Sequence, residues 1–264
     1  MPFTEGPAGP VHWTADGNGE PVVLLHGLGG DAAFWEAEQR ALADRFRVLA
    51  IDLRGSGRTP TSADGVTIGD LADDVAAVLA ELNSGPAHIV GFSLGGLVAQ
   101  EFAVRHPGAT ARLVLAATYA VMNPQARLFL DAVLDVYAGG ATPGQMFDLI
   151  CPWLFSVDFL ADPASGVYLQ YPEDDPDEQS LGDWRGLYLA QRAFDGIGRL
   201  TTITAPTLVL AGSEDRLAPV RDAETLARAI PGACTRILPG GHLFNIEAHE
   251  AFIRALRDHL LAER

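Results

Sequence analysis

The sequence contains no lysine. All 18 of its basic residues are arginine. The chain has 34 aspartates and glutamates, which gives a formal net charge of −16. Without lysine the chain cannot form a Schiff base, hold phosphate in a lysine-bearing loop or activate a serine through a lysine amine. A strongly acidic chain also repels phosphate backbones and anionic lipid, so we expect no nucleic acid and no membrane surface as partner.

Cysteines and long apolar runs are also scarce. Cys151 and Cys234 are the only cysteines, so a disulfide framework is not expected, and no His/Cys spacing indicates a metal. Both cysteines are predicted to be small core residues. No apolar run reaches the ~18–20 residues that span a bilayer, and Met1 to Gly19 lack the pattern of a secretory signal. We therefore expect a cytoplasmic globular protein without metal or cofactor, as a monomer or homodimer.

Short apolar runs alternate with helical patterns along most of the chain. One helical pattern places Ile68, Leu71 and Val75 on a single apolar stripe, and Thr67 with Asp70 forms a potential capping box at its start. The apolar runs are too short for buried helices and predict strands buried on both faces. These runs are Val22–Leu25, Val48–Ile51, His88–Phe92, Leu113–Ala116 and Thr207–Ala211. The order predicts an α/β fold, a mostly parallel open sheet flanked by helices.

The alternation stops after Ala117 and resumes at Thr207. We expect residues 1–118 and 200–264 to form the α/β core and residues 119–199 to form an inserted helical cap over the strand ends. An acidic run at 173–178 inside it is predicted to be a solvated loop. Cap side chains that could line a pocket, though each more often packs the cap's own core, are Met122, Phe129, Met146, Phe147, Trp153, Phe155, Phe159 and Trp184. Arginines that could bind a substrate carboxylate, though a surface role is commoner, are Arg127, Arg185, Arg192 and Arg199.

The segment from Gly91 to Gly95 has the pattern G-x-S-x-G between a predicted strand and a predicted helix. This context is typical of a nucleophile elbow, in which small residues two positions from the serine let strand and helix approach closely. The helix that begins behind Ser93 directs its free amides toward any developing anion. The alternative is a glycine-rich turn that holds a serine by chance.

Ser93 needs a base and an acid. His242 is the best of the seven histidines, because two glycines precede it in a loop near the C-terminus. Asp215 follows the Thr207–Ala211 strand and is the candidate acid, with Glu214 as the fallback; a turn or helix cap is the alternative role for Asp215. Parallel sheets bind ligands beyond the carboxyl ends of their strands, so these residues are expected to meet there.

Two backbone amides are expected to form an oxyanion hole. One belongs to Leu94, which follows the serine, and the other to Leu28 in the glycine-rich loop after the first inner strand. His26, at the start of that loop, is expected to shape the loop rather than act as a base.

These motifs together resemble the α/β-hydrolase superfamily from about Pro21 to the C-terminus, apart from the cap. The resemblance is carried by His26–Gly27, Asp52–Gly57, Gly91–Gly95, the Gly212–Pro219 turn with Asp215, and Gly241–His242. It is closest in general appearance to small bacterial esterases and lactonases similar to 3-oxoadipate enol-lactonases and aminoacrylate hydrolases. It implies that Ser93, Asp215 and His242 form a triad, and that Asp52 and Arg54 hold a loop beside the pocket. Dehalogenases and epoxide hydrolases of this fold use an aspartate where this chain has Ser93.

The resemblance implies a serine hydrolase that cleaves a small or medium carboxylic ester or lactone through an acyl-enzyme. The same three residues also serve C–C bond hydrolases, thioesterases, amidases and perhydrolases, because the pocket decides which carbonyl reaches the serine. A non-catalytic ligand-binding protein of the same fold is the alternative from another class.

Overall fold

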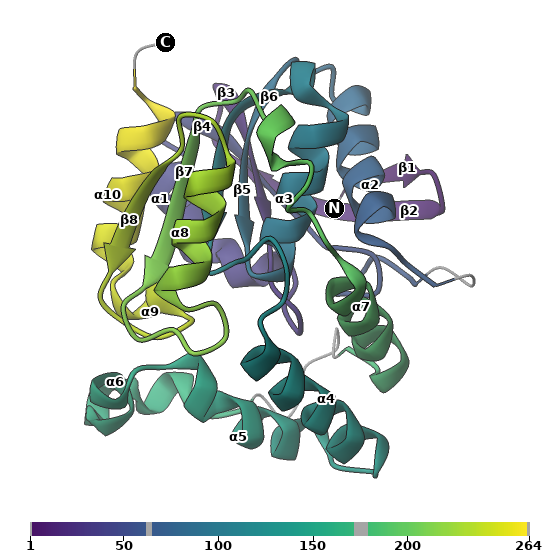
Figure 1. Ribbon diagram of the computed structural model, residues 1–264. Coiled ribbons are helices and arrows are strands. Elements are labelled where there is room, and N and C mark those ends of the chain that lie inside the picture. The colour runs from purple at the N-terminus through teal and green to yellow at the C-terminus, as the bar shows by residue number, and fades with distance from the viewer. Residues whose placement is uncertain (1, 62–64, 172–178, 263–264) are drawn as a thin grey trace.

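The computed structural model describes residues 2–61, 65–171 and 179–262 (Figure 1). The acidic run at 173–178, predicted as a solvated loop, lies outside the described residues. Within the described ranges, no helix is both long and apolar enough to cross a membrane. In the same ranges, no three His, Cys, Asp or Glu side chains are grouped so that they could hold a metal ion.

An eight-stranded sheet forms the centre of the molecule, in the order β1-β2-β4-β3-β5-β6-β7-β8. Its strands are β1 (Phe3–Gly6), β2 (Gly9–Asp16), β3 (Glu20–Leu25), β4 (Phe46–Ile51), β5 (Ala87–Phe92), β6 (Thr110–Ala116), β7 (Thr207–Gly212) and β8 (Cys234–Leu238). The strands from β3 to β8 pair in parallel, whereas β1 and β2 pair antiparallel at one edge. The predicted mostly parallel sheet is therefore confirmed, and the antiparallel edge is an addition to it.

Helices cover both faces of this sheet. The helices along the chain are α1 (Glu36–Leu42), α2 (Ile68–Glu81), α3 (Leu94–Arg105), α4 (Pro124–Ala138), α5 (Pro143–Leu154), α6 (Val157–Ala161), α7 (Leu181–Ala193), α8 (Val220–Ala229), α9 (Phe244–Glu247) and α10 (His249–Leu260). Short 3-10 turns lie at Ala32–Trp35, Pro107–Ala109, Pro163–Tyr168 and Leu200–Thr202. The helices α2, α3 and α8 lie on one face, and α1 and α10 lie on the other (Figure 1).

The buried strand side chains explain this arrangement. Alternate residues of one strand point to opposite faces, so Val23 and Leu25 of β3 join the core under α2 and α3. Their neighbours Val22 and Leu24 join the core under α1 and α10. Strands that are apolar at every position thus require a helix layer on both sides.

The predicted start of α2 is confirmed in detail. The Thr67 hydroxyl accepts the backbone N–H of Asp70 at 3.2 Å, and the Asp70 carboxylate accepts the backbone N–H of Thr67 at 2.8 Å. This reciprocal capping box satisfies two N–H groups that a helix start leaves without partners.

The prediction that both cysteines are core residues is wrong for one of them. Cys151 in α5 is buried, but Cys234 at the start of β8 is exposed. The strand β8 is the last strand of the sheet, so its first residues have a neighbouring strand on one side only. Sequence alone does not show which strand forms an edge.

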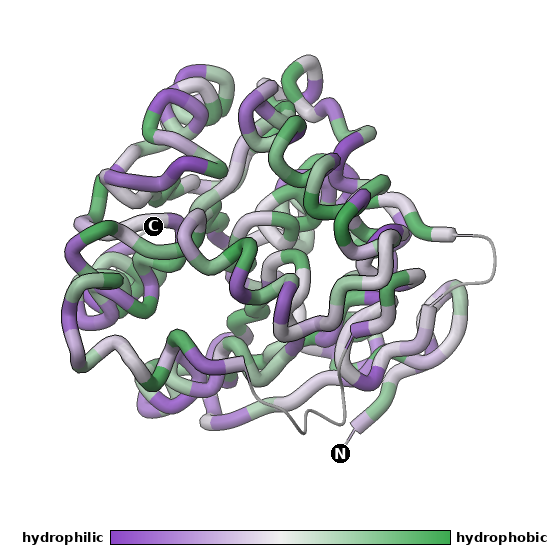
Figure 2. The backbone as a smooth tube through the Cα atoms, turned by 90° about the horizontal axis from the view of Figure 1, so that it is seen from below, coloured by the Kyte–Doolittle hydropathy of each residue, from purple (hydrophilic) through white to green (hydrophobic). Residues whose placement is uncertain are grey.

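The helices α4 to α7 lie in the β6–β7 segment, the described part of residues 117–206. In Figure 1, α4, α5 and α6 form a layer below the sheet, and α7 lies beside it. Figure 2 views the molecule from that lower side, where hydrophobic and hydrophilic stretches alternate along the tube. The buried residues Leu130, Val133 and Leu187 of this segment belong to the same core as α2 and α3. The segment therefore packs directly against the sheet domain.

Candidate active site

Ser93 lies in a strained turn between β5 and α3. Its φ of 51° and ψ of −115° fall in a region that residues other than glycine rarely adopt. Several hydrogen bonds hold the turn: Ser93 donates its N–H to the Ala116 carbonyl at 2.9 Å, and its carbonyl accepts from Gly96 N–H and the Thr118 hydroxyl. Such strain persists only where surrounding contacts enforce it, as these hydrogen bonds do here.

The glycines of the G-x-S-x-G pattern are required by close packing. A Cβ at Gly95 would lie 2.1 Å from the Leu25 carbonyl oxygen, and a Cβ at Gly91 would lie 2.2 Å from the Gly95 carbonyl oxygen. Neither site has room for a side chain.

His242 and Asp215 meet after the ends of β8 and β7. The Nδ1 of His242 and the Oδ2 of Asp215 are 2.8 Å apart, and both side chains are buried. The Oδ1 of Asp215 accepts the backbone N–H groups of Leu217 and Ala218 at 2.8 and 2.9 Å. Because the carboxylate accepts at Oδ2, Nδ1 of His242 carries the proton and Nε2 is left as the basic nitrogen.

The fallback acid is not part of this arrangement. Glu214 is exposed, and its backbone N–H donates to the Gly240 carbonyl at 2.9 Å. The structure therefore places Asp215, and not Glu214, at the imidazole.

The loop after β3 runs beside Ser93. A Cβ at Gly27 would lie 3.3 Å from the Ser93 Cβ, and the loop turns where Gly30 N–H donates to the Gly27 carbonyl at 3.2 Å. Leu28 sits in this turn, and Leu94 is the first residue of α3, where a backbone N–H has no partner within its helix. The two residues predicted to stabilise an oxyanion thus lie in the loop beside Ser93 and directly after it.

His26 is a structural residue of that loop, as predicted. Its Nε2 accepts the Leu53 N–H at 3.0 Å, so its Nδ1 carries the proton and donates to the Gly27 carbonyl at 2.8 Å. Burial lowers the pKa of His26, which keeps the ring neutral. Neither nitrogen is free to act as a base.

Asp52 and Arg54 also hold loops, as the resemblance implied. The Asp52 carboxylate accepts from the Ala32 and Arg58 backbone N–H groups at 2.7 and 2.9 Å and lies 2.7 Å from Nδ1 of His12. Arg54 is buried and forms a two-pronged ion pair with Asp74. Arg54 also donates to the backbone carbonyls of Ala8, Gly9 and Pro60, and this holds the backbone around it.

A cavity of about 220 Å³, here called the inner chamber, contains both Ser93 and His242. Its walls are mostly apolar, and Tyr119, Gln191 and the Trp184 indole supply its other polar side chains. Its apolar wall is formed by Leu28, Phe34, Phe92, Ala126, Leu130, Phe147, Ile150, Leu154, Leu217 and Leu243. Among the described residues, none that lines it is an arginine, aspartate or glutamate. An apolar chamber with a few convergent polar groups is the usual form of a small-molecule site.

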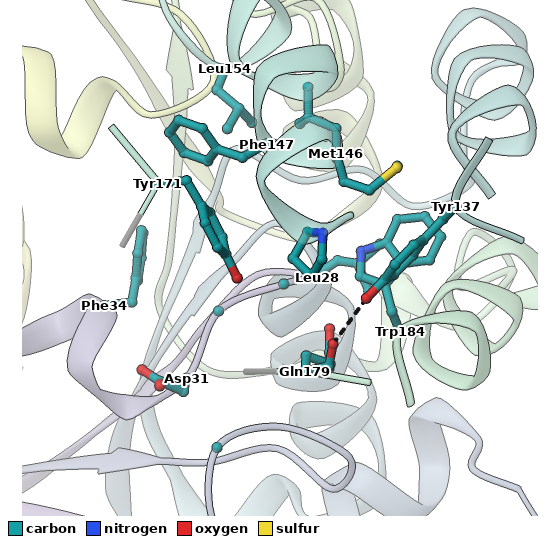
Figure 3. A pocket seen from close by; sticks show the side chains of 15 residues that line it. Leu28, Asp31, Phe34, Tyr137, Met146, Phe147, Leu154, Tyr171, Gln179 and Trp184 are labelled. Atoms are coloured by element: carbon teal, nitrogen blue, oxygen red, sulfur yellow. Dashed lines mark hydrogen bonds between the residues drawn. The ribbon is translucent and has the colours of Figure 1, made fainter. Parts of the chain in front are cut away.

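A second cavity of about 390 Å³, the outer chamber, shares part of this wall. Figure 3 shows Phe147 and Leu154 of α5 on one side and Asp31 and Phe34 of the loop after β3 on the other. The Tyr137 hydroxyl donates to the Gln179 carbonyl at 3.3 Å near Trp184. Sequence elements from both the sheet and the β6–β7 segment therefore enclose the space next to Ser93.

Seven of the eight predicted cap side chains divide into two groups, and the eighth, Met122, is buried in the core. Met146, Phe147 and Trp184 line a chamber. Others pack on each other: Phe129 stacks on Trp153, and Phe155 stacks on Phe159. None of the four candidate arginines is among the described residues that line either chamber, and two of them pair elsewhere, Arg192 with Asp131 and Arg199 with Glu101.

Sequence reasoning did not single out Tyr119, Gln191 or Glu247. Tyr119 follows the end of β6 by three residues, and a search restricted to strand ends could have found it. Gln191 lies within α7 and Glu247 within α9, and no local pattern distinguishes them from surface residues. Glu247 accepts the N–H of Gly241, the residue before His242, at 2.8 Å.

Comparisons with known proteins identify the family to which this fold belongs. The family model described as the alpha/beta hydrolase fold matches residues 20–249. A protein of Variovorax paradoxus (strain S110) named "Putative carbamate hydrolase RutD" is 34% identical over 262 residues, which cover 95% of this chain and 96% of that protein. The enol-lactonase structure from Burkholderia xenovorans LB400 has a TM-score of 0.88 at 28% identity, covering 99% of this chain and 100% of that one. A thermophilic esterase structure from Thermogutta terrifontis has a TM-score of 0.84 at 28% identity, covering 98% and 97%. With these matches and the strand–turn–helix at Ser93, the chain belongs to the α/β-hydrolase family.

Proposed function

We propose that this hydrolase cleaves a small or medium carboxylic ester or lactone through an acyl-enzyme formed on Ser93. The observation that carries the proposal is the hydrogen bond between His242 and Asp215 at the wall of an apolar chamber that also contains Ser93. Residues 119–199 act in this proposal as a cap that completes the chamber.

In the proposed reaction, Nε2 of His242 takes the proton of the Ser93 hydroxyl while Oγ bonds to the substrate carbonyl carbon. The carbonyl electrons move to oxygen, and the resulting oxyanion accepts the N–H groups of Leu28 and Leu94. The C–O bond to the leaving alcohol then breaks, and His242 gives its proton to that alcohol. Water repeats the sequence, which releases the acid and restores Ser93.

Asp215 contributes by its position. Its Oδ2 holds the proton of His242 on Nδ1, and it offsets the positive charge that the imidazole gains in each step. The two backbone N–H groups on Oδ1 fix the direction of the carboxylate. Loss of one oxyanion donor typically costs about 3–4 kcal/mol of barrier.

Carbamate hydrolysis is a second candidate, favoured by the 34% identity to the Variovorax paradoxus protein. The names of the solved relatives favour an enol-lactone or ester instead. C–C bond, thioester, amide and perhydrolase chemistry would use the same three residues. A panel with one substrate of each class, assayed under one set of conditions, ranks them by kcat/KM.

The decisive experiment compares Ser93→Ala with Ser213→Ala, a change at an exposed serine that follows β7. We expect wild type and Ser213→Ala to hydrolyse p-nitrophenyl butyrate and to take up one fluorophosphonate per chain, at Ser93 by peptide mass. We expect Ser93→Ala to do neither while its circular dichroism is unchanged. Turnover that survives in Ser93→Ala contradicts the mechanism, and a wild-type protein that neither turns over nor labels supports the non-catalytic alternative.

A further inference from the structure

The inner chamber holds a pair of polar side chains that the proposed reaction does not use. The Tyr119 hydroxyl oxygen accepts the Nε2–H of Gln191 at 2.6 Å. Both residues line the chamber and are only 3% exposed. Tyr119 follows Thr118, whose hydroxyl donates to the Ser93 carbonyl at 2.8 Å, so the pair is tied to the turn that carries Ser93.

The pair has unused hydrogen-bonding capacity. The Oε1 of Gln191 has no hydrogen-bond partner among the described residues. The Tyr119 oxygen is the acceptor in its bond to Gln191, so its own proton remains available as a donor. Burial raises the pKa of Tyr119 well above its ordinary value, so the hydroxyl keeps that proton.

The pair has one free donor and one free acceptor in either orientation of the Gln191 amide. With Nε2 toward Tyr119, the pair offers the tyrosine O–H and the amide oxygen. With the amide turned over, it offers an amide N–H and the tyrosine oxygen. Either way the chamber presents one donor beside one acceptor.

A buried polar atom without a partner is uncommon in folded proteins, because its desolvation is not compensated. An occupant that supplies the missing partners removes that penalty. The chamber's described lining holds no carboxylate and no guanidinium, so it lacks a group to balance a charged occupant. The fitting group is therefore neutral, with an acceptor next to a donor.

We propose that Tyr119 and Gln191 form a specificity site that selects ester substrates bearing a neutral carboxamide. The carboxamide oxygen accepts from one member of the pair, and its N–H donates to the other. The inference rests on the proposed function, because it concerns which ester reaches Ser93. It makes the two residues selectivity determinants, not participants in bond breaking.

The test uses matched methyl esters. Methyl malonamate, succinamate and glutaramate are each paired with the ester in which an isopropyl group replaces the carboxamide, and hydrolysis is followed by proton release. A second pair, glycolamide acetate and isobutyl acetate, places the carboxamide on the alcohol side. The variants are Gln191→Met and Tyr119→Phe, which keep side-chain volume, and the control is Tyr168→Phe, at an exposed tyrosine outside the described lining of both chambers.

For at least one pair, we expect wild type and Tyr168→Phe to favour the carboxamide, and the amide-to-alkyl ratio of kcat/KM to fall tenfold or more in both polar variants. Turnover of the alkyl ester should stay within about threefold, since a hydrogen bond affects only the substrate that makes it. If Tyr119 and Gln191 merely fasten α7 to the sheet, amide and alkyl esters lose activity together and the ratio is unchanged, which overturns the proposal.

A binding measurement separates this inference from the proposed function. Calorimetry of the matched amide and alkyl esters with Ser93→Ala reports recognition without turnover. We expect the amide to bind more tightly, and the preference to disappear in Ser93→Ala/Gln191→Met. If wild type hydrolyses no ester at all, the proposed function fails, and equal binding of the two esters then overturns the specificity site as well.

Discussion

Ser156 donates both its backbone N–H and its hydroxyl to the carboxylate of Glu247. The same carboxylate accepts the Gly241 N–H, and Leu243 N–H donates to the Leu154 carbonyl at 2.8 Å. On one side of His242, Gly241 is therefore linked through the Glu247 carboxylate to Ser156, just after the end of α5. On the other side, Leu243 is bonded directly to Leu154, the last residue of α5. Glu247 is a positioning residue that joins the β6–β7 segment to the imidazole loop.

Replacing Glu247 tests that link. Glu247→Ala leaves the Ser156 and Gly241 N–H groups without their acceptor, and we expect the free energy of unfolding to fall by about 1–3 kcal/mol. We also expect kcat on p-nitrophenyl butyrate to fall several-fold, because the imidazole loop loses its anchor. Glu247→Gln, which retains an acceptor oxygen, should recover most of both losses, and Glu250→Ala at an exposed site should match wild type. A Gln variant as impaired as Ala contradicts the positioning role.

Asp215→Asn should change which nitrogen of His242 carries the proton while leaving the fold intact. The asparagine oxygen can still accept the Leu217 and Ala218 N–H groups, but its amide directs an N–H at Nδ1 of His242. The imidazole proton is then forced onto Nε2, and we expect kcat to drop by about 10⁴. Steady-state kinetics alongside Glu214→Gln, which should stay near wild type, provides the measurement. Comparable losses in both variants would exclude the Asp215 assignment.

His26 should make the fold sensitive to acid. Its pKa is lowered in the folded state from the ordinary 6.5, so between those two values the unfolded chain binds more protons. The stability that neutral His26 contributes is therefore complete above pH 6.5 and is lost as pH falls through the lower, folded-state pKa. Protonation also replaces the acceptor of the Leu53 N–H with a second donor.

Urea unfolding of wild type and His26→Gln, at about pH 8 and about pH 5.5, measures this effect. We expect acidification to destabilise wild type more than the variant, because glutamine does not titrate. Other groups, including His259, whose pKa burial also lowers, contribute equally to both proteins. Equal losses in the two proteins would show that His26 does not titrate on unfolding.

Arg54 provides a stability prediction remote from the chemistry. Arg54→Met leaves the buried Asp74 carboxylate without two hydrogen bonds, and we expect a loss of about 3–5 kcal/mol. Arg40→Met breaks the exposed pair with Glu36 and should cost less than about 1 kcal/mol. Thermal and chemical unfolding of both variants gives the comparison. Similar small changes would mean that the Arg54–Asp74 pair is not required for the fold.

The parallel part of the fold could be predicted because its strands are buried on both faces. Such strands read as unbroken apolar runs, and β3, β5 and β7 include the predicted runs. β2 could not be found in this way, since Pro10 and His12 interrupt it and it gives no regular alternation. Its place between β1 and β4 depends on pairing with both strands, which a local pattern does not encode.

The residues around Ser93 also include some that a local sequence pattern predicts and some that it does not. Ser93, Asp215 and His242 each follow a strand and have a glycine within three residues, so position and composition together indicate them. Gln191 lies within α7 and has neither signal; it is distinguished by an amide oxygen that has no hydrogen-bond partner in the described part of the fold. Whether a polar atom has a hydrogen-bond partner depends on its neighbours in the folded chain, and a local sequence pattern does not show it.

The wall of the inner chamber is formed by two parts of the fold, the turns that follow the strands and the β6–β7 segment. Ser93 and His242 come from turns at the rim of the sheet, whereas Gln191 comes from α7. Under the proposed mechanism, exchange of α7 therefore changes which molecules the chamber accepts and leaves Ser93 and His242 in place. Natural variation or protein engineering can therefore alter substrate selectivity by changing α7 alone.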